Sequence, residues 1–282
     1  MKIARTVADL RQQIAHWRKD DERIGLVPTM GALHLGHMAL VQAACAECHR
    51  VVASIFINPK QFAPTEDLDL YPRREAADLE MLRAAGVDLV FIPALDEMYP
   101  PDFGTLVRVS GLTEGLCGAH RAGHFDGVTT VVTKLLIQVL PDIAYFGEKD
   151  YQQLMVVRRL ARDLDLPVHI AGVPTMREPD GLALSSRNIH LSAEERRIAP
   201  NLARVLGSMA AALAQDPTAV AQEIARGSAA LQQAGFAVEY LEIREAETLA
   251  ALREATASSR IFAAVRLGET RLIDNMPIAR LT

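Results

Sequence analysis

The residues best suited to chemistry lie in one short stretch, in which two histidines stand among glycines: Pro28-Thr29-Met30-Gly31-Ala32-Leu33-His34-Leu35-Gly36-His37. His34 and His37 are three residues apart, so at the start of a helix their imidazoles lie on the same side. Gly31 and Gly36 lack the Cβ atoms that would keep a ligand away from the backbone. A helix N-terminus adds partial positive charge and free N–H groups. The stretch therefore predicts an anion site, and a polyphosphate is the obvious ligand.

Two other interpretations of this stretch stay open from the residues alone. Turn glycines with partly exposed histidines would show the same pattern without binding a ligand. A metal site with two histidine ligands is less favoured, because no third ligand is close in the sequence.

Three further polar stretches follow predicted strands or turns and could serve the same site. Asn58 and Gln61 could bind a carboxylate or a hydroxyl with their amides. Gly147-Glu148-Lys149-Asp150 offers a lysine for a phosphate and an aspartate that could cap the next helix. The donor-rich loop Leu184-Ser185-Ser186-Arg187-Asn188 could fold over phosphates. Taken alone, each stretch is equally typical of a turn, a charged surface or a linker.

A cysteine pair, Cys45 and Cys48 followed by His49, superficially fits thiol-redox and haem-attachment patterns. The pair falls inside the helix predicted after the histidines, so we expect core thiols rather than a reactive site. The predicted buried stripe of that helix consists of Leu35, Met38, Val41, Cys45 and Cys48.

Composition limits the function further. The chain has 282 residues, with 30 Lys and Arg against 35 Asp and Glu, and a net charge of −5. It therefore lacks the positive field that non-specific nucleic-acid binding requires. No apolar run approaches the roughly 20 residues of a membrane span, and the N-terminus lacks the apolar core of a secretory signal. With only three cysteines, we expect a cytoplasmic protein with reduced thiols, and neither nucleic acid nor membrane as a partner.

The elements that must position these residues alternate between strand-like and helical patterns. Strands are predicted at 24–27, 51–57, 87–92, 143–146 and 168–173, and helices from about 36, at 75–85 and at 150–164. Parallel strands need crossover helices of one hand, so an α/β fold with a Rossmann-like, doubly wound parallel sheet follows. Ligands of such sheets lie beyond the carboxyl ends of the strands.

The chain changes character after Arg187. Ser192 and Glu195 have capping-box spacing at the start of a helix that continues toward Leu213. After a further helix, strands are predicted at 238–244, 260–265 and 270–273. This pattern indicates a smaller α+β C-terminal domain, and we expect a first domain at 1–175 and a second at 176–282.

The stretch from Pro28 to His37 resembles the HxGH signature of the nucleotidyltransferase superfamily, and the longer string is similar to that of the pantothenate synthetase (pantoate–β-alanine ligase) family. Four other blocks match in order: FINPKQF at 56–62, AGHF at 122–125, GEKDYQQ at 147–153 and DGLALSSRN at 180–188. Strings at 239–243 and 270–275 resemble the family's second domain. The chain departs from the family pattern at Ala122, where proline is usual, and at Leu184, where methionine is usual.

The resemblance implies binding sites for ATP with Mg²⁺, for pantoate and for β-alanine. The residues expected at the ATP site are Met30, Gly31, Ala32, Leu33, His34, Leu35, Gly36, His37, Gly147, Glu148, Lys149, Asp150, Met176, Leu184, Ser185, Ser186 and Arg187. The catalytic residues expected among them are His34, His37, Lys149, Ser185 and Arg187. The substrate-binding residues expected are Asn58, Gln61, His124 and Gln153. The candidates for magnesium are Asp67, Asp69 and Asp78, of which Asp78 is favoured.

The resemblance also implies an activity: an ATP-dependent ligase that joins pantoate to β-alanine through a pantoyl adenylate and releases AMP and pyrophosphate. His37 is then either a proton donor or a neutral hydrogen-bond donor. The family is cytoplasmic and typically dimeric, so a homodimer is expected. Two alternatives are another adenylyltransferase of the superfamily, acting on phosphopantetheine or a nicotinamide nucleotide, and a nucleotide-binding regulator without activity. An adenylyltransferase of that kind would retain the adenylyl group in its product.

Overall fold

The larger sheet consists of six parallel strands in the order β1-β4-β3-β2-β5-β6. The structure is a computed structural model, and it describes residues 1–62, 68 and 71–278. The strands are β1 (Lys2–Ala4), β2 (Ile24–Thr29), β3 (Arg50–Ile55), β4 (Leu89–Phe91), β5 (Ile143–Gly147) and β6 (His169–Val173). From β2 the chain proceeds to β3 and β4 on one side, and β5 and β6 lie on the other side. The strand order therefore reverses between β2 and β5, which confirms the doubly wound sheet and defines its topological switch point.

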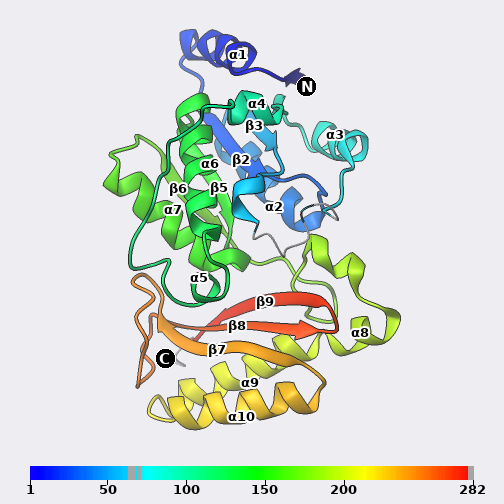
Figure 1. The fold of residues 1–282 in the computed structure, drawn as a ribbon, viewed down its shortest axis with the longest axis vertical. Helices are drawn as coiled ribbons and strands as arrows, with labels where there is room; N and C mark the ends of the chain where they lie inside the picture. Colours follow the sequence, from blue (N-terminus) through cyan, green and yellow to red (C-terminus); the bar gives the residue numbers. More distant parts are fainter. Residues whose placement is uncertain (63–67, 69–70, 279–282) are drawn as a thin grey trace.

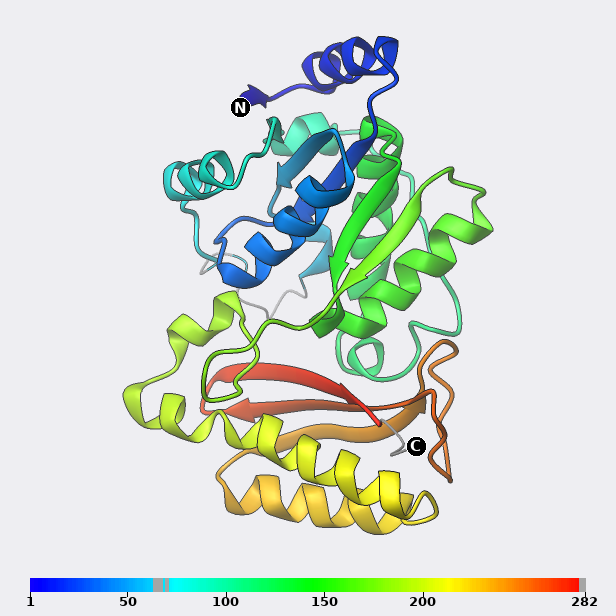
Figure 2. The same ribbon diagram turned by 180° about the vertical axis from the view of Figure 1, so that it is seen from behind.

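Helices cover both faces of this sheet because its strands are apolar on both sides (Figures 1 and 2). One face carries α1 (Val7–Lys19), α6 (His124–Val139) and α7 (Tyr151–Asp163), and the other carries α2 (Leu35–Glu47) and α3 (Glu75–Ala84). Two short helices, α4 (Leu95–Met98) and α5 (Cys117–His120), lie in the connections. Three 3₁₀ turns follow strands or loops that lead to the site: η1 (Pro59–Gln61), η2 (Glu148–Asp150) and η3 (Ser186–His190).

The C-terminal part forms an antiparallel sheet in the order β7-β8-β9. Its elements are α8 (Ala193–Ile198), α9 (Asn201–Gln215), α10 (Val220–Gln233), β7 (Ala237–Glu245), β8 (Ser259–Leu267) and β9 (Thr270–Pro277). Helices α9 and α10 cover one face of this sheet, as Figure 1 shows. The other face packs on the larger sheet's helices, where Tyr240 and Phe262 join the same apolar cluster as Phe125 and Leu154. The smaller α+β unit expected from the sequence is confirmed.

The structure corrects several details of the elements. Strand β1 was not predicted, since three residues gain strand structure only by pairing with distant β4. The helix predicted from Ser192 toward Leu213 is divided into α8 and α9 at Ala199 and Pro200, because proline supplies no backbone N–H for a continuous helix. Its capping box at Ser192 is confirmed.

The buried stripe predicted for α2 is wrong at Leu35 and Cys45, and its last member, Cys48, lies beyond the helix and is only half-buried, so the expectation of two core thiols is wrong. Its buried residues are Met38, Leu40, Val41 and Ala44. Leu35 is the first residue of the helix and is 66% exposed. Cys45 is exposed, and Cys48, just after the helix, is half-buried against the hydroxyl of Tyr145. The helix packs on the sheet through the face that carries Met38, Val41 and Ala44. Position 45 lies off this face, so the Cys45 side chain is outside the core.

Candidate active site

A cavity of about 250 Å³ opens at the carboxyl ends of β2 and β5, where the strand order reverses. Its lining brings together most of the residues that the sequence predicted for the site. These are Met30, His34, Gly36, His37, Asn58, Gln61, His124, Gly147, Lys149, Asp150, Gln153, Met176, Leu184, Ser185, Ser186 and Arg187. The predicted residues outside this lining are Gly31, Ala32, Leu33, Leu35, Asp78 and Glu148. The two other magnesium candidates, Asp67 and Asp69, lie outside the described residues.

The two histidines form a capping box at the start of α2. His34 is the N-cap, and its Nδ1 accepts a hydrogen bond from the Gly36 N–H at 3.1 Å. His37 reaches back, and its Nδ1 accepts from the His34 N–H at 3.3 Å. Their ring centroids are 4.1 Å apart. Because each Nδ1 is an acceptor, the proton of each neutral ring lies on Nε2, and both rings offer an N–H to the cavity they line.

Burial keeps both imidazoles neutral. It lowers the pKa of His34 to about 4, with the nearby Lys149 charge acting in the same direction. It lowers the pKa of His37 to about 3, with His34 as the next cause. At neutral pH the pair therefore provides two uncharged Nε2–H donors. This favours the neutral hydrogen-bond donor among the two roles that the sequence left open for His37.

Gly36 is required by this capping arrangement. A Cβ at position 36 would lie 2.8 Å from the His34 ring, closer than any real contact. The same glycine donates its N–H to that ring. The sequence analysis expected a ligand against this backbone; in the structure the His34 ring lies there, and contact of a ligand with Gly36 stays a prediction.

Asp78, on α3, holds the turn that leads into α2. Its two carboxylate oxygens accept hydrogen bonds from the backbone N–H groups of Ala32 and Leu33, both at 2.9 Å. The side chain is 2% exposed. Gly31 and Ala32 adopt positive φ values of 80° and 51°, so this is an unusual turn that needs a fixed partner. The carboxylate stabilises the turn, and coordination of magnesium by Asp78 stays a prediction.

Asn58 is the N-cap of the tight turn η1, and Gln61 is the last residue of this turn. The Asn58 amide donates to Gln61 Oε1 and to the Gly127 carbonyl, both at 3.0 Å, and accepts from the Tyr99 hydroxyl at 2.8 Å. Asn58 is 1% exposed, so its amide orients Gln61 rather than facing open space. The Gln61 amide nitrogen lies 3.0 Å from Met30 Sδ, which ties it to the histidine turn.

His124 contacts the same turn from the start of α6. Its Nδ1 lies 2.8 Å from the Gln61 carbonyl, and Arg121 also contacts this carbonyl. His124 thus supports the backbone of a predicted substrate-binding residue while it lines the cavity.

Two segments bring Lys149, Asp150 and Arg187 to the cavity, and Arg121, just before α6, adds a further cation to its lining. Lys149 lies in η2, directly after β5, and its Nζ is 3.9 Å from the Asp150 carboxylate. The Asp150 side chain makes no capping hydrogen bond to α7, so the capping role that the sequence left open for it is not seen. The second segment is the loop before η3, where the Ser185 hydroxyl accepts from the Arg187 N–H at 3.3 Å.

Sequence reasoning missed two residues that shape this cavity. Tyr71 lines it and is 6% exposed. Burial raises the pKa of Tyr71, opposed by a hydrogen bond with Ser186, so a neutral phenol contacts the serine loop. Gly127, inside α6, lies so close to η1 that a Cβ there would be 2.1 Å from the Lys60 carbonyl oxygen. A glycine inside a helical pattern was the only signal available for this close approach.

The strand order, the cavity at the switch point and the histidine-capped helix define a Rossmann-like, doubly wound α/β protein with a candidate ligand site at a helix N-terminus. Among the described helices, none has the length and apolar character needed to cross a membrane. The described residues also contain no group of three or more His, Cys, Asp or Glu side chains that could hold a metal ion.

Comparison with known proteins identifies the family. Residues 2–277 match the family described as Pantoate-beta-alanine ligase, and the chain belongs to this family. It is 56% identical over 281 residues to a pantothenate synthetase of Caulobacter vibrioides, covering 98% of both chains. It is 53% identical to a pantothenate synthetase of a Chelativorans species, over 99% of this chain and 98% of the relative.

Comparison with solved structures leads to the same family. The crystal structure of a pantothenate synthetase from Thermus thermophilus superposes with a TM-score of 0.94 at 50% identity, covering 99% of this chain and 100% of the other. A pantoate-beta-alanine ligase from Francisella tularensis, solved in complex with "beta-gamma ATP" and β-alanine, gives 0.83 at 33% identity, with coverages of 99% and 98%. The family, the fold and the enzyme class inferred from the sequence are confirmed.

Proposed function

We propose that this chain joins pantoate to β-alanine in an ATP-dependent reaction that passes through a pantoyl adenylate. The observation that carries the proposal is the convergence, in one cavity, of two neutral imidazole donors, Lys149 and the Ser185–Arg187 loop beside the amide of Gln61. The Francisella tularensis relative, which was solved with an ATP ligand and β-alanine, supports the choice of both substrates.

In the first half-reaction, a carboxylate oxygen of pantoate attacks the α-phosphorus of ATP. The bond between this phosphorus and the bridging oxygen breaks, and pyrophosphate leaves with the electron pair. The chain supplies no covalent nucleophile in this scheme, so catalysis rests on alignment and on stabilising negative charge. His34 and His37 donate from Nε2, Lys149 and Arg187 supply positive charge, and Ser185 adds a hydroxyl donor.

In the second half-reaction, the amine of β-alanine attacks the acyl carbon of the adenylate. AMP leaves with the electron pair of the carbon–oxygen bond, and the nitrogen loses a proton as the amide forms. Acyl adenylates react readily with water, so the intermediate must be enclosed. We propose that residues 176–282 act as the smaller domain that encloses it over the first domain at 1–175.

The remaining predicted site residues take supporting roles in this scheme. Gln61 and Gln153 bind pantoate, with Gln61 also facing β-alanine, and Asn58 and His124 hold Gln61 in place. Met30, Gly36, Gly147, Asp150, Met176, Leu184 and Ser186 complete the ATP site. Gly31, Ala32, Leu33 and Leu35 contribute the turn itself, and Glu148 contributes the segment before Lys149. If magnesium accompanies ATP, it would neutralise phosphate charge. Asp78 is the ligand that the sequence favoured, but both of its carboxylate oxygens already accept backbone hydrogen bonds from the turn before α2.

Pyrophosphate exchange tests the proposed order of steps. With pantoate present and β-alanine absent, labelled pyrophosphate should be incorporated into ATP, because only the first half-reaction can run. His37→Ala and Lys149→Ala should each lower this exchange far more than they lower the free energy of unfolding. Exchange that needs no pantoate, or no exchange by protein that makes pantothenate, would contradict the proposal.

We also propose a cytoplasmic homodimer. The three cysteines are free thiols in the structure, which suits a reducing compartment. The dimer rests on the family resemblance, and light scattering coupled to size-exclusion chromatography measures it directly.

A further inference from the structure

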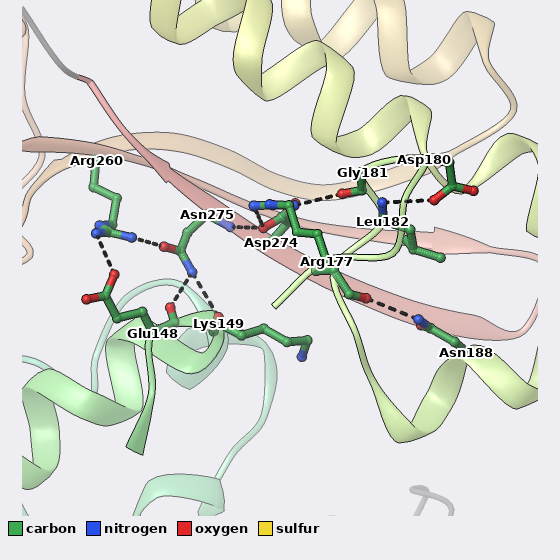
Figure 3. A network of polar contacts seen from close by, with 11 residues as sticks. Glu148, Lys149, Arg177, Asp180, Gly181, Leu182, Asn188, Arg260, Asp274 and Asn275 are labelled. Carbon is green, nitrogen blue, oxygen red and sulfur yellow. Dashed lines mark hydrogen bonds and ion pairs between the residues drawn. The ribbon is translucent and has the colours of Figure 1, made fainter. Parts of the chain in front are cut away.

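The strand β9 of the second sheet reaches the segment that carries Lys149. The side-chain amide of Asn275 donates to the carbonyl oxygens of Glu148 and Lys149, both at 2.8 Å (Figure 3). Asn275 is 4% exposed. A single amide from residue 275 therefore holds two consecutive carbonyls that are more than a hundred residues away in the sequence.

The orientation of this amide is fixed by Arg260 on the neighbouring strand β8. The Arg260 guanidinium donates to Asn275 Oδ1, which leaves the NH₂ group facing the two carbonyls. The same guanidinium lies 3.3 Å from the Glu148 carboxylate and stacks on the ring of Tyr151, 3.9 Å from its centroid. The segment around Lys149 is thus held from this side by the second sheet.

The geometry has a direct consequence for the lysine. Figure 3 shows the Lys149 side chain extending away from Asn275, while the Lys149 carbonyl oxygen accepts a hydrogen bond from the Asn275 side-chain amide. Segment η2 is only three residues long and so has little rigidity of its own. The direction in which Lys149 enters the ATP cavity therefore depends on these carbonyl contacts.

We propose that Asn275 is a positioning residue for Lys149, which fixes from the second sheet the segment that carries this lysine into the ATP cavity. The inference deepens the proposed function and rests on it. Asn275 touches neither substrate in this scheme and acts through the backbone of η2. It also couples the placement of the smaller sheet to the assembly of the phosphate site.

A double-mutant cycle tests the coupling. Asn275→Ala should lower the rate of pantoate-dependent pyrophosphate exchange about tenfold, because Lys149 loses its alignment. In a Lys149→Ala background, the same substitution should change the rate less than about twofold, because there is no lysine left to position. The kcat/KM for β-alanine in the complete reaction should stay within about twofold, since this constant reports the attack of the amine on the adenylate already formed.

Exchange by the Lys149→Ala variants could be too slow to detect. A binding measurement then replaces the exchange rate in the double-mutant cycle. Titration calorimetry with α,β-methylene-ATP should show the same pattern, with a loss of affinity on Asn275→Ala that disappears without the lysine. Asn275→Asp keeps the size of the side chain but places an oxygen opposite the two carbonyl oxygens. We expect it to lose at least as much activity as Asn275→Ala.

Ser259→Ala is the matched control. Ser259 is 2% exposed and is next to Arg260 on β8. Its hydroxyl accepts a hydrogen bond from the Thr256 N–H at 2.7 Å, in the loop that precedes β8. It should lower the melting temperature without lowering exchange. Independent, multiplicative effects of Asn275→Ala and Lys149→Ala, or an equal loss on Ser259→Ala, would overturn the inference. An unaltered protein that shows no pantoate-dependent exchange would instead overturn the proposed function.

Discussion

The histidine pair shows how backbone contacts select the state of a side chain. Each Nδ1 accepts from an N–H of the same turn, so protonation of either Nδ1 would break a bond of the capping box. The spacing of His34 and His37 predicted that the rings share one side, and their centroids at 4.1 Å confirm it. Their neutrality could not be predicted, because it depends on burial by segments from elsewhere in the chain.

This neutrality predicts a dependence of stability on pH. An unfolded histidine takes up a proton near pH 6.5, whereas burial lowers the pKa of His34 to about 4 and of His37 to about 3. Between these values the unfolded state binds more protons, so the free energy of unfolding falls as the pH is lowered from 7 toward 4. The slope is at most about 1.4 kcal/mol per pH unit for each group. Solvent screening reduces the contribution of His34 to this slope, because His34 is less buried than His37.

Urea unfolding at pH 7 and pH 5 measures this difference. His37→Asn keeps an acceptor for the His34 N–H but cannot take up a proton, so it should lose less stability than the unaltered protein between the two pH values. His16→Asn, at an exposed position of α1, is the control and should leave the difference unchanged. Equal losses in His37→Asn and the unaltered protein would contradict the assignment.

At the scale of elements, the sequence predicted what lies close along the chain and missed what distant elements contribute. The strand, turn and helix around Gly31 to His37 were predictable because glycine and capping chemistry are local. The hold of Asp78 on Ala32 and Leu33 spans more than forty residues and leaves no local pattern. The phase of α2, wrong at Cys45, likewise depends on how the helix lies on the sheet.

The Asp78 contacts give a prediction that separates its two possible roles. In Asp78→Asn, the NH₂ half of the amide cannot accept, so one backbone N–H of the turn loses its buried partner. We expect a loss of about 1–3 kcal/mol in the free energy of unfolding and a lower rate of pyrophosphate exchange at every magnesium concentration. Denaturant unfolding and magnesium titrations of the exchange rate measure the two effects.

A magnesium ligand would behave differently under the same substitution. Stability would then stay unchanged, and excess magnesium would restore the rate. Glu75→Gln on the same helix is the control, because Glu75 is exposed and pairs only with exposed Arg5 in the described structure. It should alter neither measurement.

At the scale of the whole molecule, β9 connects the smaller sheet to the two cavity segments that carry Lys149 and Arg187. Asn275 bonds the backbone of η2, and its neighbour Asp274 pairs with Arg177, which donates to the Gly181 carbonyl at the base of the serine loop. The Asp274–Arg177 pair is buried on the aspartate side. One strand therefore contacts both of the segments that carry Lys149 and Arg187. The second sheet contributes to the site in this way, although none of its described residues is in the lining of the cavity.

The apolar contact between the two sheets should then control the escape of the intermediate. Phe262 is 4% exposed, packs in the same apolar cluster as residues of α6 and α7, and lies 5.9 Å from the Tyr151 ring, centroid to centroid. Phe262→Ala should cost about 3–5 kcal/mol of stability and loosen this contact, so water reaches the adenylate more often. We expect faster release of AMP from ATP and pantoate without β-alanine, measured well below the melting temperature.

Leu213→Ala, in the core under α9 and α10, is the control. It should cost a similar stability and leave this AMP release unchanged, because Leu213 belongs to a different apolar cluster from the one that contains Phe262. If both variants release AMP equally fast, general loosening rather than the contact between the sheets governs enclosure of the intermediate.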